Sequence, residues 1–79
     1  MTWNYRIVRY RNPEHGYGLH EVYYDQFSTI VNIGAAPASF VAHPEEGAAG
    51  IIKSLERALK EAQERPVLNE SDLKLNEGA

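Results

Sequence analysis

The chain has 79 residues, a formal net charge of −3 and no cysteine. A chain of this length fits one domain and is too short for two independent hydrophobic cores, so we expect no separate catalytic domain within it. The lack of cysteine excludes a disulfide framework and thiolate zinc sites, and it makes the cytoplasm the expected location. The acidic balance argues against general nucleic-acid binding, which needs a basic surface. No stretch approaches the roughly 18 apolar residues of a membrane span, so we expect neither insertion nor export.

Three segments have the pattern of β-strands. Residues 3–11 and 17–25 alternate along the chain and are rich in aromatic and β-branched side chains, and residues 29–33 form a short apolar run. Pro13 and Gly16 lie between the first two segments, where they suit a hairpin connection. The pattern therefore predicts a three-stranded antiparallel β-meander.

From residue 44 to about residue 65 the apolar residues recur with a helical period. They fall within roughly 120° of a helical wheel and are Ala48, Ile51, Ile52, Leu55, Ala58, Leu59 and Ala62. We expect Ile51, Ile52, Leu55 and Leu59 to pack on one face of the sheet. In that case Leu55→Ala should destabilise the fold by roughly 2–5 kcal/mol. Pro66 ends the predicted helix.

The predicted fold is thus a single α+β domain over residues 1–68, in which the meander packs against one C-terminal amphipathic helix in the order β-β-β-α. Residues 34–44 are expected to cross irregularly from the sheet to the helix, because they combine two prolines with small side chains. Residues 69–79 are expected to form a polar, largely disordered tail. A core this small offsets the entropy of folding only narrowly, so dimerisation is a plausible source of further stability.

Candidate catalytic residues are few. His20 and Glu21 begin like the zinc-protease pattern H-E-x-x-H, but residue 24 is a tyrosine, and neighbours in a strand point to opposite faces. The chain has neither a recognisable nucleophilic serine nor a glycine-rich phosphate loop. We therefore predict a protein that is not an enzyme and uses no cofactor or metal. As an enzyme, it would need a pocket near the second strand, occupied by His20, Tyr24 and Glu21.

Arginines and tyrosines are interleaved in the first predicted strand; they are Arg6, Arg9 and Arg11 with Tyr5 and Tyr10. This combination stacks on bases and contacts phosphates in sheet-type RNA binders. The alternative is that the arginine stems pack over tyrosine rings, with Glu21 and Asp25 as ion partners. RNA binding is therefore a second hypothesis, and it requires all three arginines on one accessible surface.

The aromatic side chains of the predicted sheet have more bulk than one short helix can cover, so part of them should face outward. Exposed aromatic surface rimmed by arginine is typical of a protein interface, and a self-complementary interface is its simplest use. We therefore expect a protein-interaction module that forms a homodimer or captures another protein. The expected interface residues are Trp3, Tyr5, Tyr10, Tyr23 and Tyr24.

Three blocks carry a resemblance: Trp3-Asn4-Tyr5-Arg6 with Arg9-Tyr10, Gly18-Leu19-His20-Glu21-Val22-Tyr23-Tyr24-Asp25, and Pro66-Val67-Leu68-Asn69-Glu70. They resemble a family of short, uncharacterised bacterial proteins. The resemblance implies the order strand, strand, strand, helix and tail, but no activity, cofactor or catalytic residue. In layout, a meander followed by one helix is also similar to the antitoxin half of HicA/HicB-type toxin–antitoxin pairs, although the Pro-Asp-Leu-Pro-Gly-Cys-like block of that group is absent. An antitoxin-like partner of a small toxin is the third hypothesis.

Overall fold

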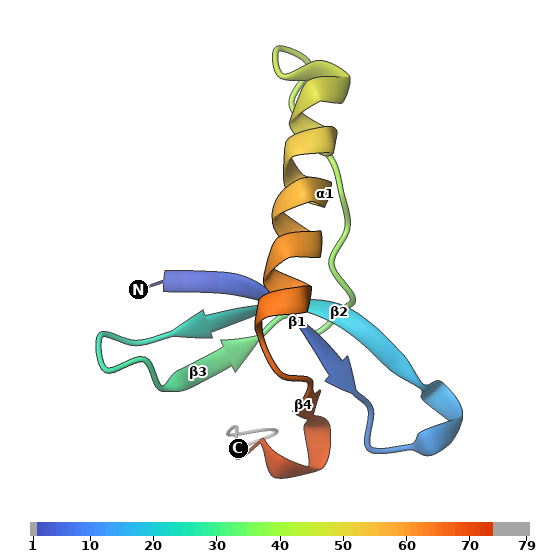
Figure 1. The fold of residues 1–79 in the computed structure, drawn as a ribbon, viewed down its shortest axis with the longest axis vertical. Helices are drawn as coiled ribbons and strands as arrows, with labels where there is room; N and C mark the ends of the chain where they lie inside the picture. The colour runs from blue at the N-terminus through green and yellow to red at the C-terminus, as the bar shows by residue number, and fades with distance from the viewer. Residues whose placement is uncertain (1, 74–79) are drawn as a thin grey trace.

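The computed structural model describes residues 2–73. They form one sheet and one long helix, with two short 3₁₀ turns at Pro13–His15 and Glu70–Asp72. The strands are β1 (Thr2–Arg9), β2 (Tyr17–Tyr24), β3 (Ile30–Ile33) and β4 (Leu68–Asn69), and the helix α1 spans Gly47–Glu64. Figure 1 shows α1 standing on the sheet by its C-terminal half, while its N-terminal half projects away from the strands.

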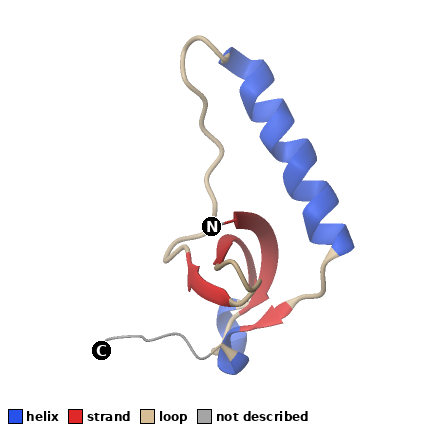
Figure 2. Cartoon of the chain, turned by 90° about the vertical axis from the view of Figure 1, so that its left-hand side faces the viewer, coloured by secondary structure: helices blue, strands red, loops and turns tan. Residues whose placement is uncertain are grey.

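The strand order is β3-β2-β1-β4. β1 and β2 pair antiparallel along their whole length, from Thr2↔Tyr24 to Arg9↔Tyr17, and β3 pairs antiparallel with β2. β4 instead runs parallel to β1. The prediction of an α+β domain is therefore confirmed, but the sheet is mixed and has a fourth strand. It is also strongly curled, as Figure 2 shows.

The fourth strand lies where we expected the tail to begin. β4 contains Leu68 and Asn69, which pair with Val8 and Arg9. Parallel strands need a long connection between them, and α1 is part of the connection that brings the chain back beside β1. The backbone N–H of Arg11 then donates to a carboxylate oxygen of Glu70 at 2.7 Å. Glu70–Asp72 follow as a 3₁₀ turn, and the largely disordered tail expected over residues 69–79 stays a prediction. Residues 74–79 of the predicted tail lie outside the described residues.

The core lies between the strands and the segment after the helix. Val8 and Val22 are 1% and 0% exposed and form its apolar centre. Three more buried side chains on this face of the sheet bond to one another: the Tyr24 hydroxyl donates to Asn4 at 2.9 Å, and Arg6 donates to the Tyr24 oxygen at 3.1 Å. Apolar burial is therefore small, and a buried hydrogen-bond network supplements it.

The helix meets the sheet through a different face from the one we expected. Ala58 is only 5% exposed, whereas Ile52, Leu55 and Leu59 are 54%, 48% and 61% exposed. Ile51 is half-buried. The prediction that this group packs on the sheet is therefore wrong for Ile52, Leu55 and Leu59.

Two charged side chains determine which side of α1 faces the sheet. Arg57 donates to the Trp3 carbonyl at 3.0 Å and to Glu61 at 3.0 Å, and its guanidinium carbon lies 3.8 Å from the centre of the Trp3 ring. Glu61 in turn accepts the Tyr5 backbone N–H at 2.9 Å. These contacts satisfy backbone groups of β1 that the two-residue strand β4 leaves without a strand partner. They bring the Arg57 and Glu61 side of the helix to the sheet and turn the leucines away from it.

Candidate functional site

The aromatic side chains expected at an interface are largely covered by other parts of the fold. Tyr5 is 5% exposed and stacks on Phe40, with 5.7 Å between ring centres. Arg57 covers the half-buried Trp3. Phe40 comes from the irregular crossing segment, and Arg57 from the charged side of the helix. Sequence periodicity gave no reason to place either residue over the sheet.

The remaining predicted aromatics bond within the domain. Tyr24 is 9% exposed and belongs to the buried network. The half-buried Tyr23 donates its hydroxyl hydrogen to Glu21 at 2.6 Å, and this hydrogen bond is the main cause that raises the pKa of Tyr23 above its usual value. Tyr10 contacts His20 through its hydroxyl at 2.7 Å. The structure therefore does not bring the five rings together as one open aromatic surface.

The arginines of the first strand are also divided. Arg6 is 8% exposed and donates to the Pro66 carbonyl at 2.8 Å, whereas Arg9 and Arg11 are exposed. Arg6 therefore does not share one accessible surface with Arg9 and Arg11, which the RNA hypothesis requires. The expected ion partners have other contacts as well: Glu21 accepts from Tyr23, and Asp25 accepts backbone N–H groups in the β2–β3 turn.

His20 lies in a built polar site on the buried face of the sheet. Its Nδ1 is 2.8 Å from the Gly34 carbonyl, and its Nε2 is 2.7 Å from the Tyr10 hydroxyl. A carbonyl only accepts, so Nδ1 carries a hydrogen, and in the neutral ring Nε2 then accepts from the Tyr10 hydroxyl. Glu21, the next residue, bonds with Tyr23 on the opposite face, so the two residues form no acid–base pair. Both ring nitrogens of His20 are occupied, which leaves neither for a metal.

A cavity of about 400 Å³ opens beside His20 and Tyr10. Val8, Ile33 and Leu73 supply apolar parts of its wall. The Tyr10 ring reaches it by lying over Gly18, where a Cβ atom would overlap the Tyr10 hydroxyl. The cavity is large enough for a small molecule. Within residues 2–73, however, no group of three or more acidic, histidine or cysteine side chains is arranged to hold a metal ion.

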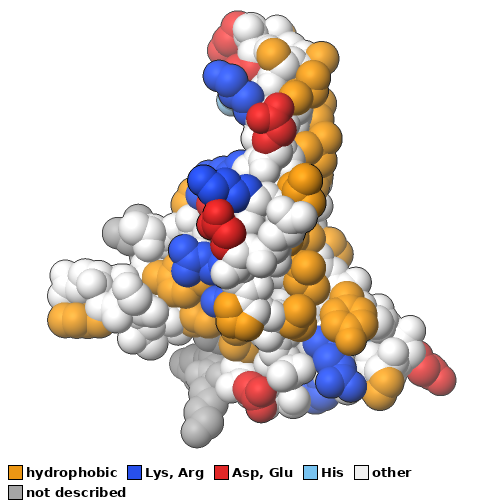
Figure 3. Space-filling view, in the orientation of Figure 1, with side chains coloured by type: hydrophobic (Ala, Val, Ile, Leu, Met, Phe, Trp, Pro, Cys, Tyr) orange, Lys and Arg blue, Asp and Glu red, His pale blue; other side chains and the backbone are white. Residues whose placement is uncertain are grey.

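Three exposed large apolar side chains lie together on α1. We call Ala48, Ile52, Leu55 and Leu59 the helix stripe; they follow one another at spacings of four, three and four residues. Figure 3 shows hydrophobic side chains in a continuous band along one side of α1. The helix stripe therefore offers a straight apolar surface that no other described element covers.

The sequence analysis named these residues but assigned them to the core. A second pattern in the same helix could have separated the two faces: Gly50, Ser54, Ala58 and Ala62 recur every four residues, and all are small. Small residues on one line allow close approach of another backbone, and these four are half-buried or buried. At Gly50, a Cβ atom would come within 3.0 Å of the Ala42 Cβ.

Comparisons with known proteins find no matching family model, no matching curated protein and no matching solved structure. The resemblance of the three sequence blocks to short bacterial proteins therefore stays a prediction. Between residues 2 and 73, no helix has the length and apolar character needed to cross a membrane.

Proposed function

We propose that this chain is a small protein-interaction module without enzymatic activity, and that it associates with a second copy of itself through the helix stripe. The observation that carries this proposal is the alignment of Ile52, Leu55 and Leu59 on one side of α1, each about half exposed or more. Contiguous apolar surface of this kind is typical of interaction sites. The proposed interface thus lies on the helix and not on the sheet, where the sequence analysis expected it.

The strength of the association can be bounded from these three side chains. Complete burial of a leucine or isoleucine side chain contributes about 1.5–3 kcal/mol, so burial of the exposed half contributes about 1 kcal/mol. A symmetric pair buries six such side chains, or about 6 kcal/mol. Association itself costs at least about 4 kcal/mol in lost freedom of motion. These three side chains alone leave a net gain of only about 2 kcal/mol, which corresponds to a Kd of about tens of millimolar, so a dimer that light scattering detects must bury further surface beside the helix stripe.

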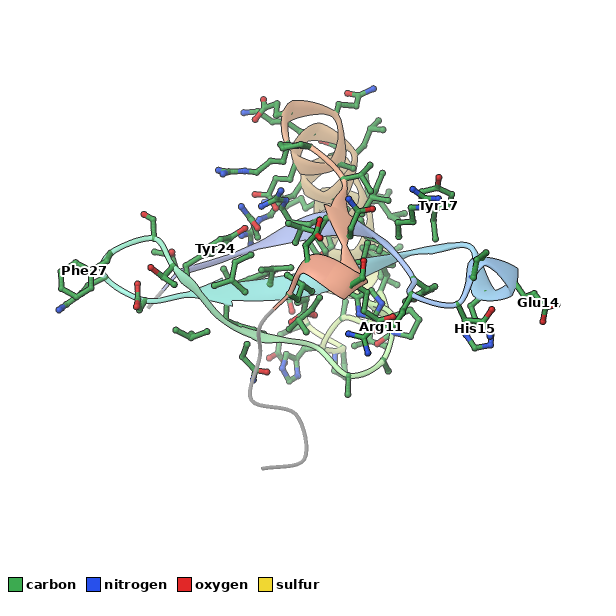
Figure 4. All side chains as sticks on the ribbon, turned by 90° about the horizontal axis from the view of Figure 1, so that it is seen from below. Arg11, Glu14, His15, Tyr17, Tyr24 and Phe27 are labelled. Carbon is green, nitrogen blue, oxygen red and sulfur yellow. The ribbon has the colours of Figure 1, made fainter. Side chains whose placement is uncertain are left out.

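The first experiment is light scattering across a dilution series, with Leu59→Glu as the test variant. A charge at this exposed position should prevent association without unfolding the monomer, which circular dichroism can check. Phe27→Glu is the matched control, because Phe27 is 76% exposed and lies at the tip of the β2–β3 turn, far from α1 (Figure 4). We expect the wild type and the control to dimerise and Leu59→Glu to stay monomeric. A wild type that is monomeric at every concentration would refute the proposal.

A further inference from the structure

We propose that the chain binds the phosphate group of a small ligand in a cavity beside Arg6 of β1. Arg6 is 8% exposed, so its guanidinium is a buried positive charge. Among residues 2–73, the one ion pair joins Arg57 to Glu61, and Arg6 has no carboxylate partner. A charge in a protein interior is costly unless an opposite charge accompanies it. The described part of the fold therefore holds a buried cation without compensation.

The hydrogen bonds of Arg6 also leave donors free. Its terminal nitrogens donate to the Tyr24 hydroxyl at 3.1 Å and to the Pro66 carbonyl at 2.8 Å, and both acceptors are uncharged. Its Nε–H is buried and has no acceptor within the described residues. A guanidinium has five N–H donors, and its forked edges match the paired oxygens of an oxyanion. Two bonds therefore hold the side chain in place, but the anion that its geometry suits is missing.

An open cavity of about 500 Å³ has Arg6 in its wall. This volume is within the range of sites for small ligands. Asn4, Tyr24 and Ser28 line the same cavity, and Ser28 belongs to the β2–β3 turn that carries Phe27 (Figure 4). The Tyr24 hydroxyl donates to the side-chain oxygen of Asn4. The amide N–H groups of Asn4 and the hydroxyl of Ser28 can therefore donate to an oxyanion.

The charges around the cavity favour an anion with two negative charges. Arg65 and Glu61 also line it, and Arg65 is exposed directly after α1. The Glu61 carboxylate pairs with Arg57 at 3.0 Å and accepts the Tyr5 N–H, so its charge is already balanced. Within the described residues, Arg6 and Arg65 remain as two positive charges without partners. A phosphate monoester carries close to two negative charges at pH 7, whereas a carboxylate group carries one.

This cavity lies apart from the helix stripe. A helix turns about 100° per residue, so Glu61 is about 160° and Arg65 about 120° around the helical axis from Leu59. Phosphate binding therefore requires no second copy of the chain. The proposed self-association and the phosphate site can each fail without the other.

A titration with inorganic phosphate, followed by NMR, tests the site. The ionic strength is held constant with sodium chloride, so that the screening of charges does not change. The Arg6 Nε–H gives a local signal, because a buried N–H exchanges slowly with water. We expect saturable shifts of this signal and of the backbone amides of Asn4 and Ser28. Acetate is the second probe, and we expect its Kd to be at least tenfold higher than that of phosphate.

Substitutions assign the binding to this cavity. Arg65→Gln removes an exposed charge without disturbing the core and should raise the Kd for phosphate at least threefold. Lys53→Gln is the matched control, because Lys53 is also exposed and lies about 18 Å away along the axis of α1; its Kd should equal that of the wild type. Arg6→Lys keeps the charge but loses the forked edge, and it should raise the Kd at least tenfold. Circular dichroism shows whether this buried variant folds, and Arg65→Gln decides if it does not.

Three results would overturn the proposal. The first is the absence of saturable shifts with phosphate. The second is an equal rise of the Kd in Arg65→Gln and Lys53→Gln, which would mean that the anion is attracted to the surface as a whole. The third is binding of acetate as tight as that of phosphate, which would assign the cavity to a carboxylate.

Discussion

The rotation of α1 can be tested by comparing two neighbouring positions, Leu55 and Ala58. Leu55 is 48% exposed, so truncation removes only about half of the roughly 1.5–3 kcal/mol that complete burial of a leucine contributes. Truncation at an open surface leaves no internal cavity, and the cavity is what raises the cost of Leu→Ala in a core to about 2–5 kcal/mol. We therefore expect Leu55→Ala to lower the free energy of unfolding by about 1 kcal/mol.

A substitution at Ala58 should lower the free energy of unfolding more than the truncation of Leu55, although alanine is the smaller residue. Ala58 is 5% exposed and lies about 60° around the helix from the sheet-facing Glu61. A leucine at this position would push α1 away from β1, and overpacking of this kind costs about 1–3 kcal/mol. The displacement would also weaken the hydrogen bond from the Tyr5 N–H to Glu61, so we expect Ala58→Leu to cost about 2 kcal/mol or more.

Urea unfolding of both variants measures these free energies. The protein concentration must be low enough to keep the chain monomeric, because association stabilises the folded state by mass action. If Leu55→Ala costs 2–5 kcal/mol under these conditions while Ala58→Leu is neutral, the leucines face the sheet. That result would refute both the rotation of α1 and the exposure of the helix stripe.

The contacts of β1 and β2 provide three more tests. Glu61→Ala leaves the Tyr5 N–H without its acceptor and should lower the free energy of unfolding by about 1–3 kcal/mol, whereas Glu61→Gln should retain most of the stability. Gly18→Ala should displace the Tyr10 ring, because the new Cβ would overlap its hydroxyl, and should shift the NMR signals of the imidazole bonded to it. Burial raises the pKa of Tyr5 above its usual 10.0, so the folded state keeps this proton longer than the unfolded state. The associated stability is therefore complete below about pH 10 and is lost as the pH rises through the raised pKa. Tyr5→Phe should reduce this alkaline loss in urea titrations, and an unchanged pH dependence would contradict the assignment.

Local pattern was sufficient to predict most of the secondary structure. Alternation over residues 17–25 predicted β2 to within one residue of its observed end at Tyr24, and Pro66 marked the end of α1 at Glu64. These features are local, because an alternating segment can bury one face only as a strand and a helix cannot continue through proline. The faces of His20 and Glu21 followed from the same alternation.

Local patterns were not sufficient to predict the candidate site. The residues of the helix stripe were all identified as apolar and helical, but the apolar arc of α1 is wide enough to contain both that line and the line of small residues through Ala58. Periodicity shows that an arc is apolar and does not show which part of it meets the sheet. The packing of Phe40 on the aromatic side chains of the sheet could not be predicted either, because Phe40 lies in a segment without a periodic apolar pattern.

The sequence by itself thus determined the α+β class, the antiparallel meander and the extent of the helix, because each depends on contacts between near neighbours in the chain. Tertiary structure alone decided the parallel strand β4 and the rotation of α1. A two-residue strand has no period to detect, and it pairs with β1 only after the helix has carried the chain back across the sheet. The rotation depends on bonds from Arg57 to Trp3 and from Glu61 to Tyr5, between residues 54 and 56 positions apart. Contacts at that separation exist only in the folded chain, and they leave the helix stripe facing outward.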